Sequence, residues 1–243
     1  MIATLQWGTL AVCGVVTLAR VPSLLRGENR SLFAVFALMT LAILLSIDAP
    51  YLAVDQALGG VNIANLVLRF IIFAGIFFLG VRVARGFSAD DALRLITGPV
   101  GIAVAAAASA AVVLVFLTMD TAGSSAGLVA LSAKDDRNAA LVEYYGAAGR
   151  LYPAFITVAL LPAMLRTLRS GLPVLVRSSA AVLALGTVAI SLSLLSPVIP
   201  PSLGFLRFVV NYSAVLCLVL GLSLIWLAKT LAKRATKKQA GMT

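Results

Sequence analysis

Seven apolar stretches dominate this chain and restrict the folds open to it. Each is about 20 residues long, the length at which an α-helix crosses the roughly 30 Å hydrocarbon core of a bilayer. Hydrophobic residues make up 61% of the 243 residues and charged residues only 12%, so little sequence remains for a separate soluble domain. We expect an all-α, polytopic membrane protein with one transmembrane domain over 1–228 and a basic tail over 229–243. The expected membrane-spanning segments are 1–19, 31–49, 58–81, 96–119, 144–165, 178–199 and 206–228.

The positive charges gather in alternate connections, which predicts an orientation in the membrane. When the connections are assigned to two sides in turn, one side receives 14 of the 19 Lys and Arg residues. Because cytoplasmic loops carry such an excess, we expect the amino terminus outside the cell and the carboxyl terminus in the cytoplasm. The basic tail is expected to bind anionic lipid headgroups and no nucleic acid. The 14 residues are Arg20, Arg26, Arg30, Arg82, Arg85, Arg94, Arg166, Arg169, Arg177, Lys229, Lys233, Arg234, Lys237 and Lys238.

The sequence lacks the residues on which most enzymes depend. It has no histidine, which removes the commonest general base and every imidazole metal ligand. Cys13 and Cys217 lie inside apolar stretches, where a thiol behaves as a small hydrophobe. No HExxH, GxSxG, Walker A or Rossmann glycine pattern occurs. We therefore expect no enzymatic activity, no cofactor and no metal site.

The segment 58–81 carries a polar stripe on an otherwise apolar helix. At 100° per residue, Asn62, Asn65 and Arg69 fall within an arc of roughly 60°. Arg69 is expected about 4 Å from the bilayer midplane. A guanidinium at that depth costs on the order of 3 kcal/mol unless it faces protein or water. The stripe is therefore expected to face the interior of a helix bundle.

Five more polar residues are expected near Arg69, at the outer ends of neighbouring segments. A pocket that opens outward between 31–49, 58–81, 144–165 and 206–228 would bring them together, with Asp48 or Glu143 as the ion-pair partner of Arg69. Three interpretations remain open for Arg69: snorkelling to the lipid headgroups, a structural ion pair, or a role in substrate binding or gating. The five residues are Asp48, Glu143, Arg150, Arg207 and Asn211.

The order of features in the first 100 residues resembles a group of actinobacterial seven-helix membrane proteins of unknown function, which are commonly described as transporters. The resemblance implies seven helices in a bacterial plasma membrane, and it implies no particular substrate. Many members carry a further cytoplasmic domain after the seventh helix. The features that carry the likeness are a basic first loop, a segment that ends at Asp48 and Pro50, and then Tyr51, Asp55, Gly60, Asn62 and Leu66.

Two functions are compatible with these patterns. The first is a multi-pass membrane protein that transports or binds a small solute in an outward-facing polar cavity around Arg69. The second is a membrane sensor or scaffold whose cytoplasmic loops and basic tail dock a protein partner. The sequence favours the first, because the polar residues concentrate inside the apolar segments.

Overall fold

The computed structural model describes residues 2–27, 30–194 and 204–240, which form helices joined by turns and contain no strand. Six helices are long and apolar enough to cross a membrane, and a seventh crossing is made if α3 and α4, which are bent by 94°, count as one. The chain therefore has the build of a multi-pass membrane protein. The helices are α1 (Ile2–Leu18), α2 (Val21–Leu25), α3 (Arg30–Leu44), α4 (Asp48–Ala57), α5 (Ile63–Gly86), α6 (Asp90–Thr97), α7 (Pro99–Thr118), η1 (Ala126–Leu128), α8 (Val129–Ser132), α9 (Asp136–Leu168), α10 (Val174–Leu192) and α11 (Phe205–Ala240).

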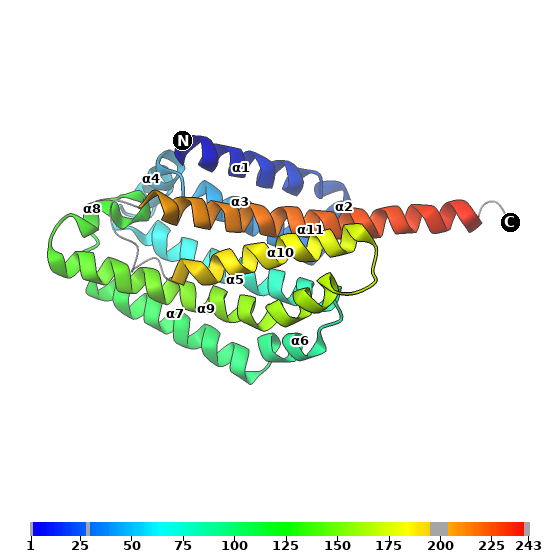
Figure 1. Ribbon diagram of the computed structural model, residues 1–243. Helices are drawn as coiled ribbons and strands as arrows, with labels where there is room; N and C mark the ends of the chain where they lie inside the picture. The colour runs from blue at the N-terminus through cyan, green and yellow to red at the C-terminus, as the bar shows by residue number, and fades with distance from the viewer. Residues whose placement is uncertain (1, 28–29, 195–203, 241–243) are drawn as a thin grey trace.

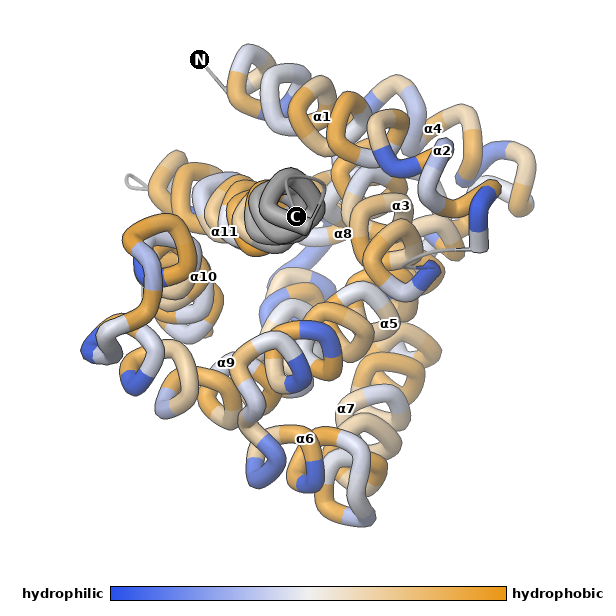
Figure 2. The backbone as a smooth tube through the Cα atoms, turned by 90° about the vertical axis from the view of Figure 1, so that its right-hand side faces the viewer, coloured by the Kyte–Doolittle hydropathy of each residue, from blue (hydrophilic) through white to orange (hydrophobic). Residues whose placement is uncertain are grey.

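Six of the long helices form a ring. Each contacts the next around the ring in the order α1, α3, α5, α9, α10 and α11, and α11 contacts α1 again. Figure 2, a view along the bundle, shows this ring with α7 outside it, packed on α9 and α5. A closed ring of helices surrounds an interior to which each helix contributes one face.

The two ends of the bundle carry different short elements. One end holds α4, η1 and α8, and we call it the α4 end; the opposite end holds α2 and α6, and we call it the α6 end (Figure 1). α11 leaves the bundle at the α6 end, so the amino-terminal start of α1 and the carboxyl-terminal part of α11 lie at opposite ends (Figure 1).

The segment predicted over 31–49 is shorter than expected. α3 ends at Leu44, and its 15 residues rise only about 22 Å. The stretch around Pro50 and Asp55, expected as a connector, is the helix α4, which turns away from α3 by 94°.

The segment predicted over 58–81 begins later and ends later. α5 starts at Ile63 because Gly59, Gly60 and Asn62 all have positive φ, of 104°, 70° and 60°, and form a turn. Asn62 is thus the residue before the helix. The periodicity had predicted that Asn62, Asn65 and Arg69 share one helical face, and this prediction is wrong for Asn62.

α9 is much longer than the predicted segment 144–165. Its 33 residues rise about 50 Å. The Asp135 carboxylate caps its amino terminus by accepting a hydrogen bond from the Asn138 amide at 2.6 Å. The helix continues through Pro153 and Pro162 without interruption. The segment predicted over 178–199 is α10, and the expected stop at Pro200 and Pro201 lies outside the described residues.

Candidate functional site

A cavity of about 360 Å³ lies inside the ring, lined by α3, α5, α9, α10 and α11. Its polar lining residues lie toward the α4 end of the cavity, with Arg150 fourteen residues after the start of α9, and the lining deeper in the bundle is apolar. Among the residues singled out from the sequence, Asn65, Arg69, Arg150 and Asn211 line it, whereas Asp48, Asn62, Glu143 and Arg207 do not. The other polar lining residues are Ser46, Ser193 and Tyr212.

Arg69 points from α5 toward α9 and contacts an aromatic ring. Its guanidinium carbon lies 5.0 Å from the centroid of the Tyr145 ring, within cation–π range. The Arg69 Nε and the Tyr145 hydroxyl are both buried and have no hydrogen-bond partner among the described residues. The three ion pairs that the described part of the chain forms all use other cations.

Gly149 makes room for the Arg69 side chain. A Cβ at position 149 would lie 2.9 Å from both Cδ and Nη1 of Arg69, closer than side-chain atoms approach in folded proteins. A side chain at position 149 would therefore displace the Arg69 side chain from its present place between α5 and α9.

Arg150 supplies a second guanidinium to the same cavity. Its Nη1 is buried without a hydrogen-bond partner among the residues described, and it lies within electrostatic range of Arg69, Glu143 and Arg207. Glu143 is the nearby carboxylate, but it accepts a hydrogen bond from Arg207 Nη1 at 3.1 Å. The positive charge of Arg69 and Arg150 is thus not neutralised by a carboxylate on the cavity wall.

The expected ion-pair partners of Arg69 are placed elsewhere. Asp48 is exposed in the first turn of α4 and takes no part in the cavity. Glu143 is paired with Arg207, which ties α9 to α11. The prediction of an ion pair between Arg69 and one of these two acids is therefore wrong, and the aromatic ring of Tyr145 takes that place.

Asn65 and two hydroxyl groups complete the polar end of the cavity. Asn65 lies one helical turn before Arg69, and its buried Oδ1 has no partner among the described residues. The hydroxyls of Ser46 and Tyr212 bond to each other at 2.8 Å and join α3 to α11. Asn211, one residue before Tyr212, is exposed at this end.

Asp55 anchors the turn that leads into α5. Its carboxylate is fully buried and accepts hydrogen bonds from the amides of Asn62 and Ala64, each at 2.9 Å, and from the Ser124 hydroxyl. It therefore caps the amino terminus of α5 in place of the Asn62 side chain. These three donors replace the water that the carboxylate loses on burial, so the fold depends on keeping them in place.

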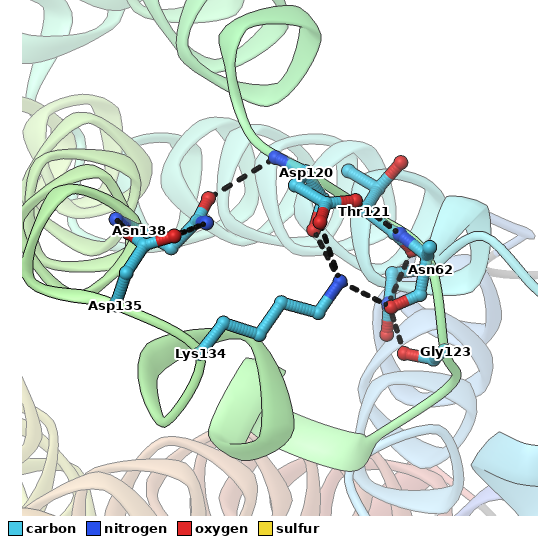
Figure 3. Close-up of polar contacts among 8 residues, drawn as sticks. Asn62, Asp120, Thr121, Gly123, Lys134, Asp135 and Asn138 are labelled. Atoms are coloured by element: carbon cyan, nitrogen blue, oxygen red, sulfur yellow. Dashed lines mark hydrogen bonds and ion pairs between the residues drawn. The ribbon is translucent and has the colours of Figure 1, made fainter.

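The Asn62 side chain ties the same turn to the connection between α7 and α9. Its amide nitrogen donates to the carbonyls of Thr121 and Gly123 at 3.0 and 2.8 Å (Figure 3). Its oxygen accepts from the Tyr51 hydroxyl at 2.8 Å and from the Ser125 amide at 3.0 Å. Asn62 is thus a structural residue whose four hydrogen bonds hold three segments together.

Lys134 binds residues at the start of the connection that follows α7. Its ammonium pairs with the Asp120 carboxylate at 2.9 Å and donates to the carbonyls of Asp120 and Ala122 (Figure 3). The hydrogen bond from Lys134 lowers the pKa of Asp120. Gly127, in the same connection, lines the cavity, so these contacts position a part of the cavity wall.

A further buried arginine lies at the α6 end, remote from the cavity. Arg20, expected in a loop, is only 3% exposed. Its guanidinium carbon is 3.9 Å from the Trp226 ring centroid and 5.7 Å from that of Phe36. It joins α11 to the region between α1 and α2 and has no contact with the candidate site.

Sequence reasoning missed Asp55 and Gly149. The signal for Asp55 is the Gly59–Gly60 pair that follows it, since consecutive glycines predict a turn that brings the chain back to a carboxylate. The signal for Gly149 is its position beside Arg150 in an apolar helix, because small residues mark close helix contacts in membranes.

The site combines two guanidinium groups with side-chain amides and hydroxyls. In the described part of the chain, no three His, Cys, Asp or Glu side chains are placed to hold a metal ion. Guanidinium groups with unused N–H donors bind carboxylates and phosphates through charge-assisted hydrogen bonds. Searches of family models, characterised proteins and solved structures found no match to this chain.

Proposed function

We propose that this protein is a multi-pass membrane protein that binds a small anionic solute in the cavity headed by Arg69 and Arg150, and that it moves this solute across the membrane. The observation that supports it is a pair of guanidinium groups, one from α5 and one from α9, that line the same cavity, with a buried N–H on each that has no partner among the described residues. Asn65 and Asn211 line the same end of the cavity, and each carries a side-chain amide with N–H donors.

The electrostatics favour a charged ligand over a neutral one. A guanidinium away from water is costly unless a counter-charge or several acceptors compensate it. The Tyr145 ring compensates Arg69 in part, by about 2 kcal/mol where the pair is shielded from water. An anion between Arg69 and Arg150 would offset the remaining cost and the repulsion between the two cations.

The orientation proposed from the loop charges places this cavity on the outer side of a bacterial plasma membrane. The α6 end holds α2, α6 and the departing helix α11. Six of the 14 basic residues counted from the sequence lie in α6 and α11, and Arg20 and Arg26 flank α2. Cytoplasmic loops carry such an excess. The cavity would then open toward the outside at the α4 end.

Replacement of Arg69 by Gln tests the proposed site. The purified protein in nanodiscs is titrated by calorimetry with inorganic phosphate and with acetate, and R69Q is expected to bind at least one of them about 30-fold more weakly than the wild type does, since a lost charged contact in a shielded site costs about 2 kcal/mol. R150Q is expected to show the same loss.

Arg94→Gln is the matched control, because Arg94 lies in α6 with a side chain that is 79% exposed. Its anion affinity is expected to equal that of the wild type. If R69Q and R150Q fold and bind both anions as R94Q does, the cavity is not an anion site.

A further inference from the structure

The lining of the cavity changes from polar to apolar along the bundle axis. On α5 the lining residues run from Asn65 and Arg69 at the α4 end to Ile72 and Ile76 deeper in the bundle. On α11 Phe208 comes first, then Asn211 and Tyr212, and then Val215 and Leu218. On these two walls, no described polar residue lines the cavity beyond Arg69 and Tyr212. α3 runs in the opposite direction, so its lining residues are met in reverse: Ser46, just after the end of the helix, lies at the α4 end, and Ala42 and Leu38 lie deeper.

The apolar part of the cavity extends well below the arginines. Ile76 lies seven residues after Arg69, which corresponds to about 10 Å along the helix axis. No charged residue lines this depth among the residues that the structure describes, and its walls are Ile, Leu, Met, Val and Ala side chains. Side chains of this kind offer water no hydrogen-bond partners.

A small hydrophilic anion would use only the upper part of this space. Bound at Arg69 and Arg150, it would leave the lower part empty, with no ligand group against Ile72, Ala42 and Val215. An alkyl chain attached to the anion would fill the space and remove apolar surface from water, which is the main source of affinity in such pockets.

We propose that the ligand of this site is an amphipathic anion with a single alkyl chain, whose carboxylate or phosphate head binds Arg69 and Arg150 and whose chain extends along α5 and α11 toward the α6 end. This inference rests on the proposed anion site and adds the chemistry of the rest of the ligand. The cavity volume of about 360 Å³ is near the lower limit of ligand pockets, which favours one chain over the two of a membrane phospholipid.

A chain-length series tests the inference with the full-length protein in nanodiscs. The probes are methyl, butyl and octyl phosphate, the matching carboxylates acetate, pentanoate and nonanoate, and the neutral octanol. Saturable binding is measured at free concentrations below micelle formation, with empty nanodiscs subtracted. Each buried methylene can raise affinity by up to about fourfold, so octyl phosphate or nonanoate is expected to bind at least tenfold more tightly than its short homologue.

Two variants fill the apolar part and leave the arginines in place. Ala42→Phe and Val215→Phe are each expected to weaken binding of the long-chain anion at least tenfold and to change binding of the short anion by less than twofold. Ala107→Phe is the matched control, because Ala107 is exposed on α7 and does not line the cavity. The experiment includes two filling variants, so the test remains valid if one of them does not fold.

The outcomes separate the two proposals. If short and long anions bind equally, and A42F and V215F change neither, the site takes a hydrophilic anion and the inference is wrong while the proposed function stands. If no anion binds, or if R69Q binds every anion as the wild type does, both proposals fail. If octanol binds as tightly as octyl phosphate, the cavity selects the chain without the charge, which also overturns the inference. A preference for one of the two series identifies the head as phosphate or carboxylate.

Discussion

A guanidinium inside an apolar bundle must be compensated, and the two cavity arginines obtain little compensation from the protein. Arg69 has an aromatic ring at 5.0 Å, a contact of about 2 kcal/mol where water is excluded. The cost of placing the charge at membrane depth is on the order of 3 kcal/mol or more. The cost that remains after this contact is small enough for a folded protein to tolerate. A bound anion would offset it.

Half of the residues chosen from the sequence meet in the cavity, and the others are placed elsewhere by a local turn or by contacts between helices. Helical periodicity brings Asn65 and Arg69 to one wall. It fails for Asn62, because a φ of 60° places that residue in a turn before the helix begins. The pairing of Glu143 with Arg207 joins residues 64 positions apart, and such a pairing depends on which helices are neighbours, which the sequence pattern does not contain.

The two acids of α4 provide a matched pair for testing the turn before α5. Asp55→Asn leaves at least one backbone amide among Asn62 and Ala64 without an acceptor, because the new amide group has only one oxygen. An unsatisfied buried donor costs about 2 kcal/mol, so D55N is expected to lower the free energy of unfolding by that amount. Asp48→Asn, in the exposed first turn, is expected to change it by less than about 0.5 kcal/mol. Equal stability of D55N and D48N in a denaturant titration would contradict the buried role of Asp55.

At the scale of elements, the helices differ in length more than their apolar segments predict. α3 is about 22 Å long and α9 about 50 Å, although both were expected to be close to 20 residues. α3 ends early because the chain bends by 94° into α4. α9 begins early because the Asp135 cap starts a helix in polar sequence, where hydrophobicity carries no signal. The presence of long apolar helices was therefore easier to predict than the residues at which each one ends.

The approach of α5 to α9 gives a prediction at this scale. Gly149→Ala would place a methyl group 2.9 Å from the Arg69 side chain, so α5 and α9 must separate or Arg69 must leave the wall. We expect G149A to weaken anion binding at least tenfold, as measured by the same calorimetric titration. Gly14→Ala is the control: a Cβ there meets no atom within 4 Å, and the change is expected to leave binding unaltered and to stabilise α1 by about 0.5–1 kcal/mol. Unchanged affinity in G149A would show that Arg69 does not need its present position.

At the scale of the whole molecule, the ring of six helices explains why one cavity collects polar residues from distant parts of the sequence. Each helix turns one face inward, and the cavity residues come from five helices between positions 38 and 218. α7 lies outside the ring (Figure 2) and contributes no lining residue, which agrees with its lack of charged residues. The sequence predicted a bundle with an inward polar stripe, but the closure of the ring is a property of helix order that no single segment shows.

The proposed orientation can be tested with one cysteine at each end of the bundle. In a background in which Cys13 and Cys217 are replaced by Ala, Arg137→Cys places a thiol at the start of α9, at the α4 end, and Arg94→Cys places one in α6, at the α6 end; both residues are exposed. Because the excess of positive charge marks the cytoplasmic side, a membrane-impermeant maleimide is expected to label R137C in intact cells and R94C only after the membrane is opened. The reverse pattern would place the cavity on the cytoplasmic side, so that its anion would come from within the cell. Labelling of both thiols in intact cells would show that the two ends of the bundle do not lie on opposite sides of the membrane.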